Sequence, residues 1–333
     1  MHKTPPLFIS NKKDVLAFSE LINNSQTRPK IEAGIKKQPE RGFHMPVLSI
    51  IACRMFEDEL AHIISSDREL EQLIVVEGKD SFVLLRKLKS DNCLPVTAPL
   101  ERVPFLLGNG HGSGFMTIAK PLLSLPFFRK IHEKMKLKAA YRVTVVVNLL
   151  RLGLHDDLDL LKSEVYENIK EMASFSDGIL LFYCSCGEAF ESLEENFSEL
   201  DCPLYCLKDG NGEVVADCIS AALGVNAAYD EIMYACRGTG ALYFTPMWAS
   251  SWKQMGEERK KSRNFNDNFL KDPRYSRVVK LDTGLSYDPD FHKNVRDFAR
   301  TFDMEIVEVK GSAELAEKSY RAAKKGVIQH TLE

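Results

Sequence analysis

Short strand patterns alternate with helical patterns from residue 46 almost to the end of the chain. Apolar runs rich in β-branched or aromatic residues occupy 47–52, 73–77, 141–149, 178–183, 203–207, 241–245, 277–282 and 304–309. Stretches such as 54–64, 160–172 and 295–302 have the spacing of amphipathic helices. Because parallel strands need crossover connections, this alternation predicts an α/β fold with a largely parallel, Rossmann-like sheet flanked by helices.

The organisation along the chain suggests one main domain with an extension. The 333 residues are enough for one large or two ordinary domains. Residues 1–45 are rich in Lys, Asn, Gln and Pro, so we predict an N-terminal extension, a domain over 46–325 and a tail at 326–333. Candidate lobes cover 46–150 and 151–325. The glycine-rich segment 108–114, which contains His111, lacks the spacing of a dinucleotide or P-loop motif and predicts a loop.

Charge and composition exclude several classes of function. Lys and Arg (44) nearly balance Asp and Glu (47), and the net charge of -3 gives no footprint for nucleic acid. We find no apolar run of the roughly 20 residues that cross a bilayer and no signal-peptide pattern, so we expect a cytoplasmic protein that does not bind membranes. Thiols are reduced in that compartment, and the eight cysteines predict no disulfide framework.

Several cysteines fall where predicted strands end or helices begin. Cys53 follows the first strand, Cys184 and Cys186 follow the strand at 178–183, and Cys218 opens a short helix with Asp217 as its N-cap. The carboxyl ends of parallel strands meet at one edge of a sheet, where ligands bind. If these strands are neighbours, the sulfurs converge.

These residues fit metal ligation or nucleophilic attack, because a helix N-terminus stabilises a thiolate. Gly187 permits the turn after Cys186, and His155 lies at another junction between a strand and a helix, as a fourth ligand or general base. No CxxC pair occurs, so a metal site must be assembled from distant positions. The alternatives are that the cysteines are small buried hydrophobes and that His155 and Asp156 cap a helix.

The only two tryptophans follow a predicted strand end. Thr245 and Pro246 begin a helix on which Trp248 and Trp252 share one face with Met255. Such a stripe is usually part of a core, although it could also wall a flat ligand.

The order of these motifs resembles the domain of unknown function 1638 family. The resemblance runs over about residues 46–320 and includes the Lys-Leu-Asp-Thr-Gly motif at 280–284. Cys53, His155, Cys186, Asp217, Cys218 and Trp248 fall on motif positions. Cys184 departs from the pattern, which has glycine there, and Ala216 stands where the family has histidine. The resemblance implies an association with methanogenesis, anaerobic one-carbon metabolism and corrinoid-dependent methyl transfer.

Two classes of function follow. The first is a metal-binding protein in which Cys53, Cys186 and Cys218, with His155 or Cys184, hold zinc, iron or an iron–sulfur cluster in methyl-transfer metabolism. The alternative is an accessory protein without turnover that binds a corrinoid or another flat cofactor and assists methyltransferase proteins. A reversible Cys184–Cys186 disulfide is the third option, and one intervening residue would strain it.

Overall fold

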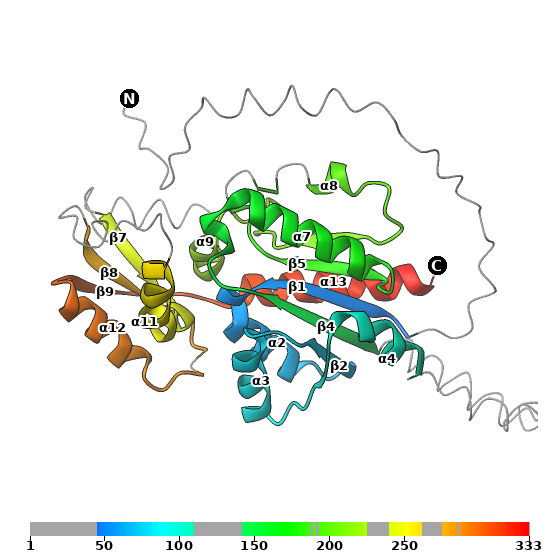
Figure 1. Ribbon diagram of the computed structural model, residues 1–333, viewed down its shortest axis with the longest axis horizontal. Coiled ribbons are helices and arrows are strands. Elements are labelled where there is room, and N and C mark those ends of the chain that lie inside the picture. Colours follow the sequence, from blue (N-terminus) through cyan, green and yellow to red (C-terminus); the bar gives the residue numbers. More distant parts are fainter. Residues whose placement is uncertain are drawn as a thin grey trace, which may run out of the picture. The chain divides into compact units, whose positions relative to one another are not determined.

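A six-stranded sheet forms the larger part of the described protein. The computed structural model describes residues 45–109, 142–186, 189–190, 193–224, 240–261, 275–285 and 287–332. The sheet has the order β3-β2-β4-β1-β5-β6, and all its strand pairs are parallel (Figure 1). Its strands are β1 (Val47–Cys53), β2 (Leu70–Val76), β3 (Val96–Ala98), β4 (Val143–Leu150), β5 (Gly178–Phe182) and β6 (Leu204–Cys206). The predicted α/β class is confirmed.

Helices cover both faces of this sheet, which explains why its central strands are apolar throughout. One face packs against α2 (Glu57–Ser66), α3 (Ser81–Ser90) and α13 (Glu314–Leu332). The other packs against α4 (Val103–Asn109), α7 (Leu158–Ala173) and α8 (Leu193–Asn196). Along β1 the side chains alternate, so that Ile50 lies in the first layer and Ile51 in the second.

The strands β1 and β4 are neighbours in the sheet, and the helices that follow them lie on opposite faces. Strand β1 leads through the short helix η1 (Arg54–Phe56) into α2 on one face, whereas β4 leads through η4 (Leu154–Asp156) into α7 on the opposite face. Such a switch opens a crevice at the carboxyl ends of the strands, the usual ligand position in this class of fold. Cys53 lies at the end of β1 and therefore at this crevice.

A second parallel sheet contains β7 (Gly240–Phe244), β8 (Tyr275–Asp282) and β9 (Glu305–Lys310) in that order. Helices α11 (Pro246–Lys261) and α12 (Phe291–Thr301) pack on one face, around Phe244 and Phe298. The short helix α9 (Cys218–Leu223) lies against the other face through Ala222. Because α9 also places Cys218 against the core of the first sheet, it contacts both sheets.

The sequence predicted most of these elements, with three differences. Strand β3 was not among the predicted strands, because its three residues are too few to show a pattern. Strand β5 pairs with β1 and β6 pairs with β5, so the first sheet contains strands from before and after residue 150. Helix α13 continues to Leu332 and includes most of the segment expected as a tail. Among the described helices, none is long and apolar enough to cross a membrane.

Candidate functional site

Cys53 is placed by the end of β1. Strands β1 and β5 are paired up to Ala52 and Phe182, so the next residues, Cys53 and Tyr183, follow side by side. Cys53 has an extended backbone and precedes the first turn of η1. The nearby backbone N–H of Met55 partly offsets the rise in the pKa of Cys53 that burial causes. Cys53 packs against the apolar layers on both faces of the first sheet, at the carboxyl end of β1.

The turn after β5 is held against a distant segment of the chain. The backbone N–H of Ser185 donates to the carbonyl of Val215 at 2.8 Å, and that of Cys186 donates to Ala216 at 3.1 Å. Cys186 has a φ of 46°, a left-handed conformation that non-glycine residues rarely adopt outside functional or tight turns. These bonds bring Cys186 beside the start of α9.

Asp217 fixes the start of α9, as the sequence predicted. Its carboxylate accepts hydrogen bonds from the backbone N–H groups of Ile219 at 2.9 Å and Ser220 at 2.8 Å. Gly224, with a φ of 89°, ends the helix. The cap therefore sets the position of Cys218, the first residue of the helix, and leaves the carboxylate close to the cysteines.

Four of the predicted cysteines lie close enough to influence one another. Burial raises the pKa of Cys53 to about 11, and the negative charge of Glu57 adds to this effect. Burial raises the pKa of Cys186 to about 12, and negative charge at Cys53 and Asp217 would add to it. Burial also raises the pKa values of Cys184 and Cys218 well above the usual range. Negative charge at Asp217 and at the neighbouring sulfurs would raise them further. Near neutral pH the four groups are therefore uncharged thiols.

The remaining predicted ligands, His155 and Cys184, come from different parts of the fold. His155 lies half-buried in η4, after the strand next to β1. Gly187 lies outside the described residues, as do His111 and Cys236. Within the described part of the chain, no three His, Cys, Asp or Glu side chains are already arranged as metal ligands. Cys184 is buried in the core of the first sheet.

The two tryptophans have different surroundings. Trp252 packs edge to face against Phe298 at a ring-centroid distance of 5.2 Å and against Phe302 at 6.3 Å. Trp248 is half-buried and packs against the cores of both sheets. Helix α11 contacts η1 and α2, and Met247 is buried in the core of the first sheet. Of the two indoles, Trp248 is the one next to the first sheet.

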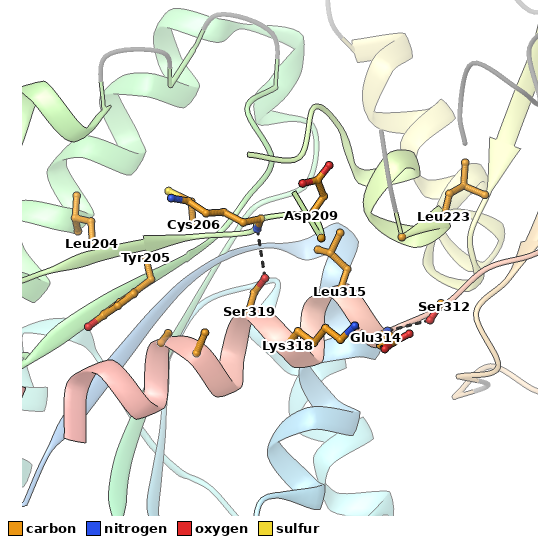
Figure 2. Close-up of a pocket in the computed structure, with 15 residues that line it drawn as sticks. Leu204, Tyr205, Cys206, Asp209, Leu223, Ser312, Glu314, Leu315, Lys318 and Ser319 are labelled. Atoms are coloured by element: carbon orange, nitrogen blue, oxygen red, sulfur yellow. Dashed lines mark hydrogen bonds and ion pairs between the residues drawn. The ribbon is translucent and has the colours of Figure 1, made fainter. Parts of the chain in front are cut away.

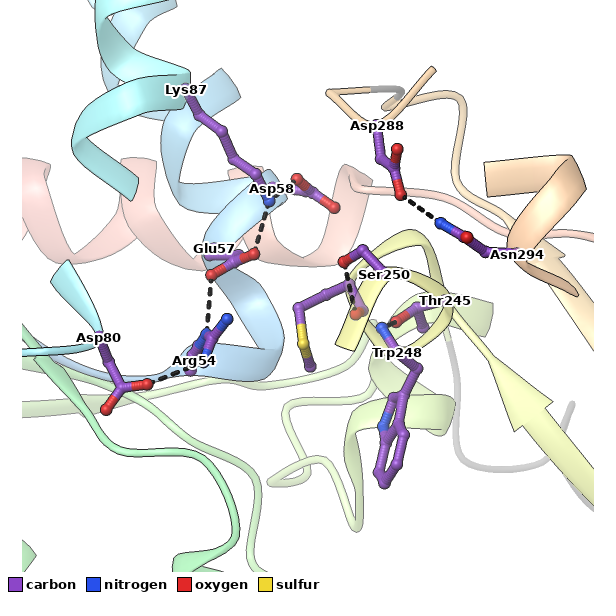
Figure 3. A network of polar contacts seen from close by, with 11 residues as sticks. Arg54, Glu57, Asp58, Asp80, Lys87, Thr245, Trp248, Ser250, Asp288 and Asn294 are labelled. Carbon is purple, nitrogen blue, oxygen red and sulfur yellow. Dashed lines mark hydrogen bonds and ion pairs between the residues drawn. The ribbon is translucent and has the colours of Figure 1, made fainter. Parts of the chain in front are cut away.

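A buried ion-pair network follows directly after Cys53, and the sequence had indicated only an ordinary acidic helix start there. Arg54 bonds to Glu57 at 3.2 Å and to Asp80 at 2.8 Å (Figure 3). Lys87 binds Glu57 at 2.7 Å and also pairs with Asp58. The side chains of Glu57 and Lys87 are only 1% and 6% exposed. Acidic residues are common in exposed first turns of helices, so no sequence pattern indicated this burial.

Two further groups at the site were missed. Burial raises the pKa of Glu59 to about 8, and the negative charge of Asp58 adds to this effect. The Tyr183 hydroxyl lies beside the Cys53 sulfur and is buried without a well-aligned hydrogen-bond partner among the described residues. A tyrosine immediately before Cys184 at a strand end was the available signal, but an aromatic residue there also fits a buried strand.

A groove of about 590 Å³ lies elsewhere, between β6, the first turns of α13 and the end of α9 (Figure 2). Its lining combines Tyr205, Lys208 and Leu315 with the Lys318–Glu314 ion pair. Cys53, the turn at 184–186 and Cys218 do not contribute to it. The cysteine cluster is therefore separate from this groove.

The fold and the position of the cysteines define a Rossmann-like α/β protein with a buried thiol cluster at the strand ends. A family described as "Protein of unknown function (DUF1638)" matches residues 149–320, just over half of the chain, and the protein belongs to this family. The matched part includes His155, Cys186, Cys218 and Trp248, whereas Cys53 precedes it. A search of curated proteins gave no match.

Proposed function

We propose that the protein binds a soft metal ion, zinc or iron, through the thiolates of Cys53, Cys186 and Cys218. The observation that carries this proposal is the convergence of cysteines from β1, the turn after β5 and α9 at the carboxyl ends of the strands. Sulfur ligands favour zinc, copper(I) and iron–sulfur centres over hard cations. An iron–sulfur cluster is compatible with the same ligands.

The chemistry of the thiols supports this assignment. Burial disfavours the thiolate forms of Cys53 and Cys186 and raises both pKa values, and negative charge at Cys53 adds to the rise at Cys186. A bound divalent cation would replace the protons and convert this repulsion into ligation, with release of protons on binding. The sulfurs are not pre-arranged as ligands, so we propose that side-chain rotation at Cys186 and Cys218 completes the site.

A fourth ligand would decide between a structural and a reactive centre. Cys184 lies within the cluster, and His155 follows the neighbouring strand β4. With either of them bound, the centre is closed and structural. With three thiolates and an open position, a zinc ion would act as a Lewis acid toward a thiol or water. We propose the open form in anaerobic methyl-transfer metabolism, a link that rests on the family resemblance.

The corrinoid alternative has weaker support. A flat cofactor held between two indoles needs both rings to be accessible, yet Trp252 already contacts Phe298, Phe302 and the ammonium of Lys253. Trp248 alone remains beside the first sheet. A role for Trp248 beside the first sheet is therefore compatible with the metal proposal and does not require a corrinoid.

Metal analysis of protein purified without oxygen and without a chelating column tests the proposal. We expect roughly one equivalent of zinc or iron in the wild type and its loss in Cys53→Ser, Cys186→Ser and Cys218→Ser. Cys93→Ser serves as the control, because Cys93 is a half-buried thiol whose pKa is affected by Asp91 and not by the other cysteines. A full metal complement in Cys186→Ser would contradict the proposal.

A further inference from the structure

The strand register places Tyr183 next to Cys53. The β1–β5 pairing ends at Ala52 and Phe182, whose side chains both belong to the layer under α2. The following residues therefore point to the opposite layer, where Tyr183 is part of the core and Cys53 packs against it. Because two adjacent strand ends present these side chains on the same face, the contact is built into the sheet.

The Tyr183 hydroxyl has an environment that an apolar ring alone would not require. The side chain is 3% exposed, and its ring meets Phe190 edge to face at 6.0 Å. The hydroxyl lacks a well-aligned hydrogen bond to any described residue, although it lies beside the Cys53 sulfur. A buried, unsatisfied hydroxyl costs about 1–3 kcal/mol, which phenylalanine at this position would avoid.

A neutral thiol is a weak hydrogen-bond acceptor, whereas a thiolate accepts strongly. Hydrogen bonds from surrounding side chains orient metal ligands and tune their basicity. The register leaves the Cys53 sulfur as the acceptor beside the Tyr183 hydroxyl, and a sulfur bound to a metal would accept this hydrogen bond more strongly than a free thiol. This reasoning connects an unexplained polar group in the core with the cysteine at the end of β1.

We propose that Tyr183 is a positioning residue, whose hydroxyl donates a hydrogen bond to the Cys53 sulfur and makes Cys53 the firmly held ligand of the centre. The metal-bound part of this inference rests on the proposed function. The bond withdraws electron density from the sulfur, so Cys53 is less reactive toward an alkylating substrate than the other cluster thiolates. It also restricts the Cys53 side chain to one rotamer beside Tyr183.

The test compares Tyr183→Phe with Tyr166→Phe. Tyr166 packs against the same apolar layer, and its hydroxyl accepts a hydrogen bond from the Asn196 amide, so this variant controls for loss of a phenol group. Both proteins are titrated with Co²⁺, and the sulfur-to-cobalt charge-transfer band is recorded. The S–H stretching band of Cys53, assigned by its loss in Cys53→Ala, is measured in the metal-free proteins.

We expect Tyr183→Phe to shift the charge-transfer band to lower energy and to weaken Co²⁺ binding about 10–100-fold, because the sulfur loses its hydrogen-bond donor. The Cys53 S–H band should move as well, whereas Tyr166→Phe should change none of these. Unchanged spectra and affinity in Tyr183→Phe would overturn the inference. If the wild type binds no Co²⁺, the proposed function fails, and the S–H band alone decides whether Tyr183 contacts Cys53.

Discussion

Two groups of buried ionisable side chains include residues at the end of β1. They differ in whether their charges are paired with opposite charges. The network formed by Arg54, Glu57 and Lys87 pairs each charge with an opposite charge. The cluster around Cys53 and Cys186 has no cation among its described electrostatic influences, which are other thiols and carboxylates. The first group is complete as it stands, whereas the second can ionise only if a cation is supplied. This difference separates a structural network from a candidate binding site.

The largest effect should come from breaking the balanced group. Lys87→Met leaves Glu57 and Asp58 buried without their ammonium partner and should lower the free energy of unfolding by about 3–5 kcal/mol. Urea unfolding measures this change. Lys89→Met, at an exposed position on the same helix, should have little effect. A loss below about 1 kcal/mol in Lys87→Met would show that Glu57 and Asp58 can be buried without the Lys87 ammonium at little cost in free energy.

The variant Glu59→Gln tests whether the buried Glu59 carboxyl is protonated in the folded protein. Its pKa is raised from 4.5 to about 8, so the folded state binds the proton more tightly than the unfolded state. This contribution to stability is fully present below pH 4.5 and is lost as the pH rises to 8. Relative to Glu59→Gln, the wild type should lose roughly 2–4 kcal/mol across that range.

Urea unfolding at several pH values between 4.5 and 8.5 gives the comparison for Glu59. Glu77→Gln changes an exposed carboxyl and should run parallel to the wild type. Parallel curves for Glu59→Gln and the wild type would mean that Glu59 is ionised in the folded protein at neutral pH.

Metal addition should distinguish the cysteine cluster from the balanced network. With free zinc at about 100 times the dissociation constant, ligand binding should stabilise the wild type by about 2.7 kcal/mol. Cys186→Ser should gain much less, whereas Lys87→Met should keep the gain, because its defect lies in the network. Thermal melting with and without zinc measures both effects. Equal stabilisation of all three proteins would place zinc binding elsewhere.

The smallest effect concerns the cap that positions Cys218. Asp217→Ala removes two hydrogen bonds at the start of α9 and should cost about 1 kcal/mol. Asp217→Asn keeps an oxygen acceptor and should retain most of the stability. Circular dichroism during urea unfolding gives both values. Equal losses in the two variants would mean that the carboxylate charge, and not the capping bond, stabilises this helix start.

Much of the local structure could be predicted because it depends on neighbouring residues. The Asp217 cap and the Pro246 helix start need only local hydrogen bonds and backbone preferences, and the structure confirms them. The strand patterns were recognised for the same reason. Strand β3 was missed, since three residues carry no measurable alternation. Tyr183 and Glu57 were missed as partners because their significance depends on residues far along the chain.

The sequence by itself determined the α/β class and the cysteine positions at strand ends and a helix start. Only the tertiary structure decided that β5 lies beside β1 and that the turn after β5 bonds to residues 215 and 216. Those contacts bring Cys53, Cys186 and Cys218 together across about 165 residues. The physical reason is that propensity and periodicity act over a few residues, whereas strand order follows from burying all apolar faces at once.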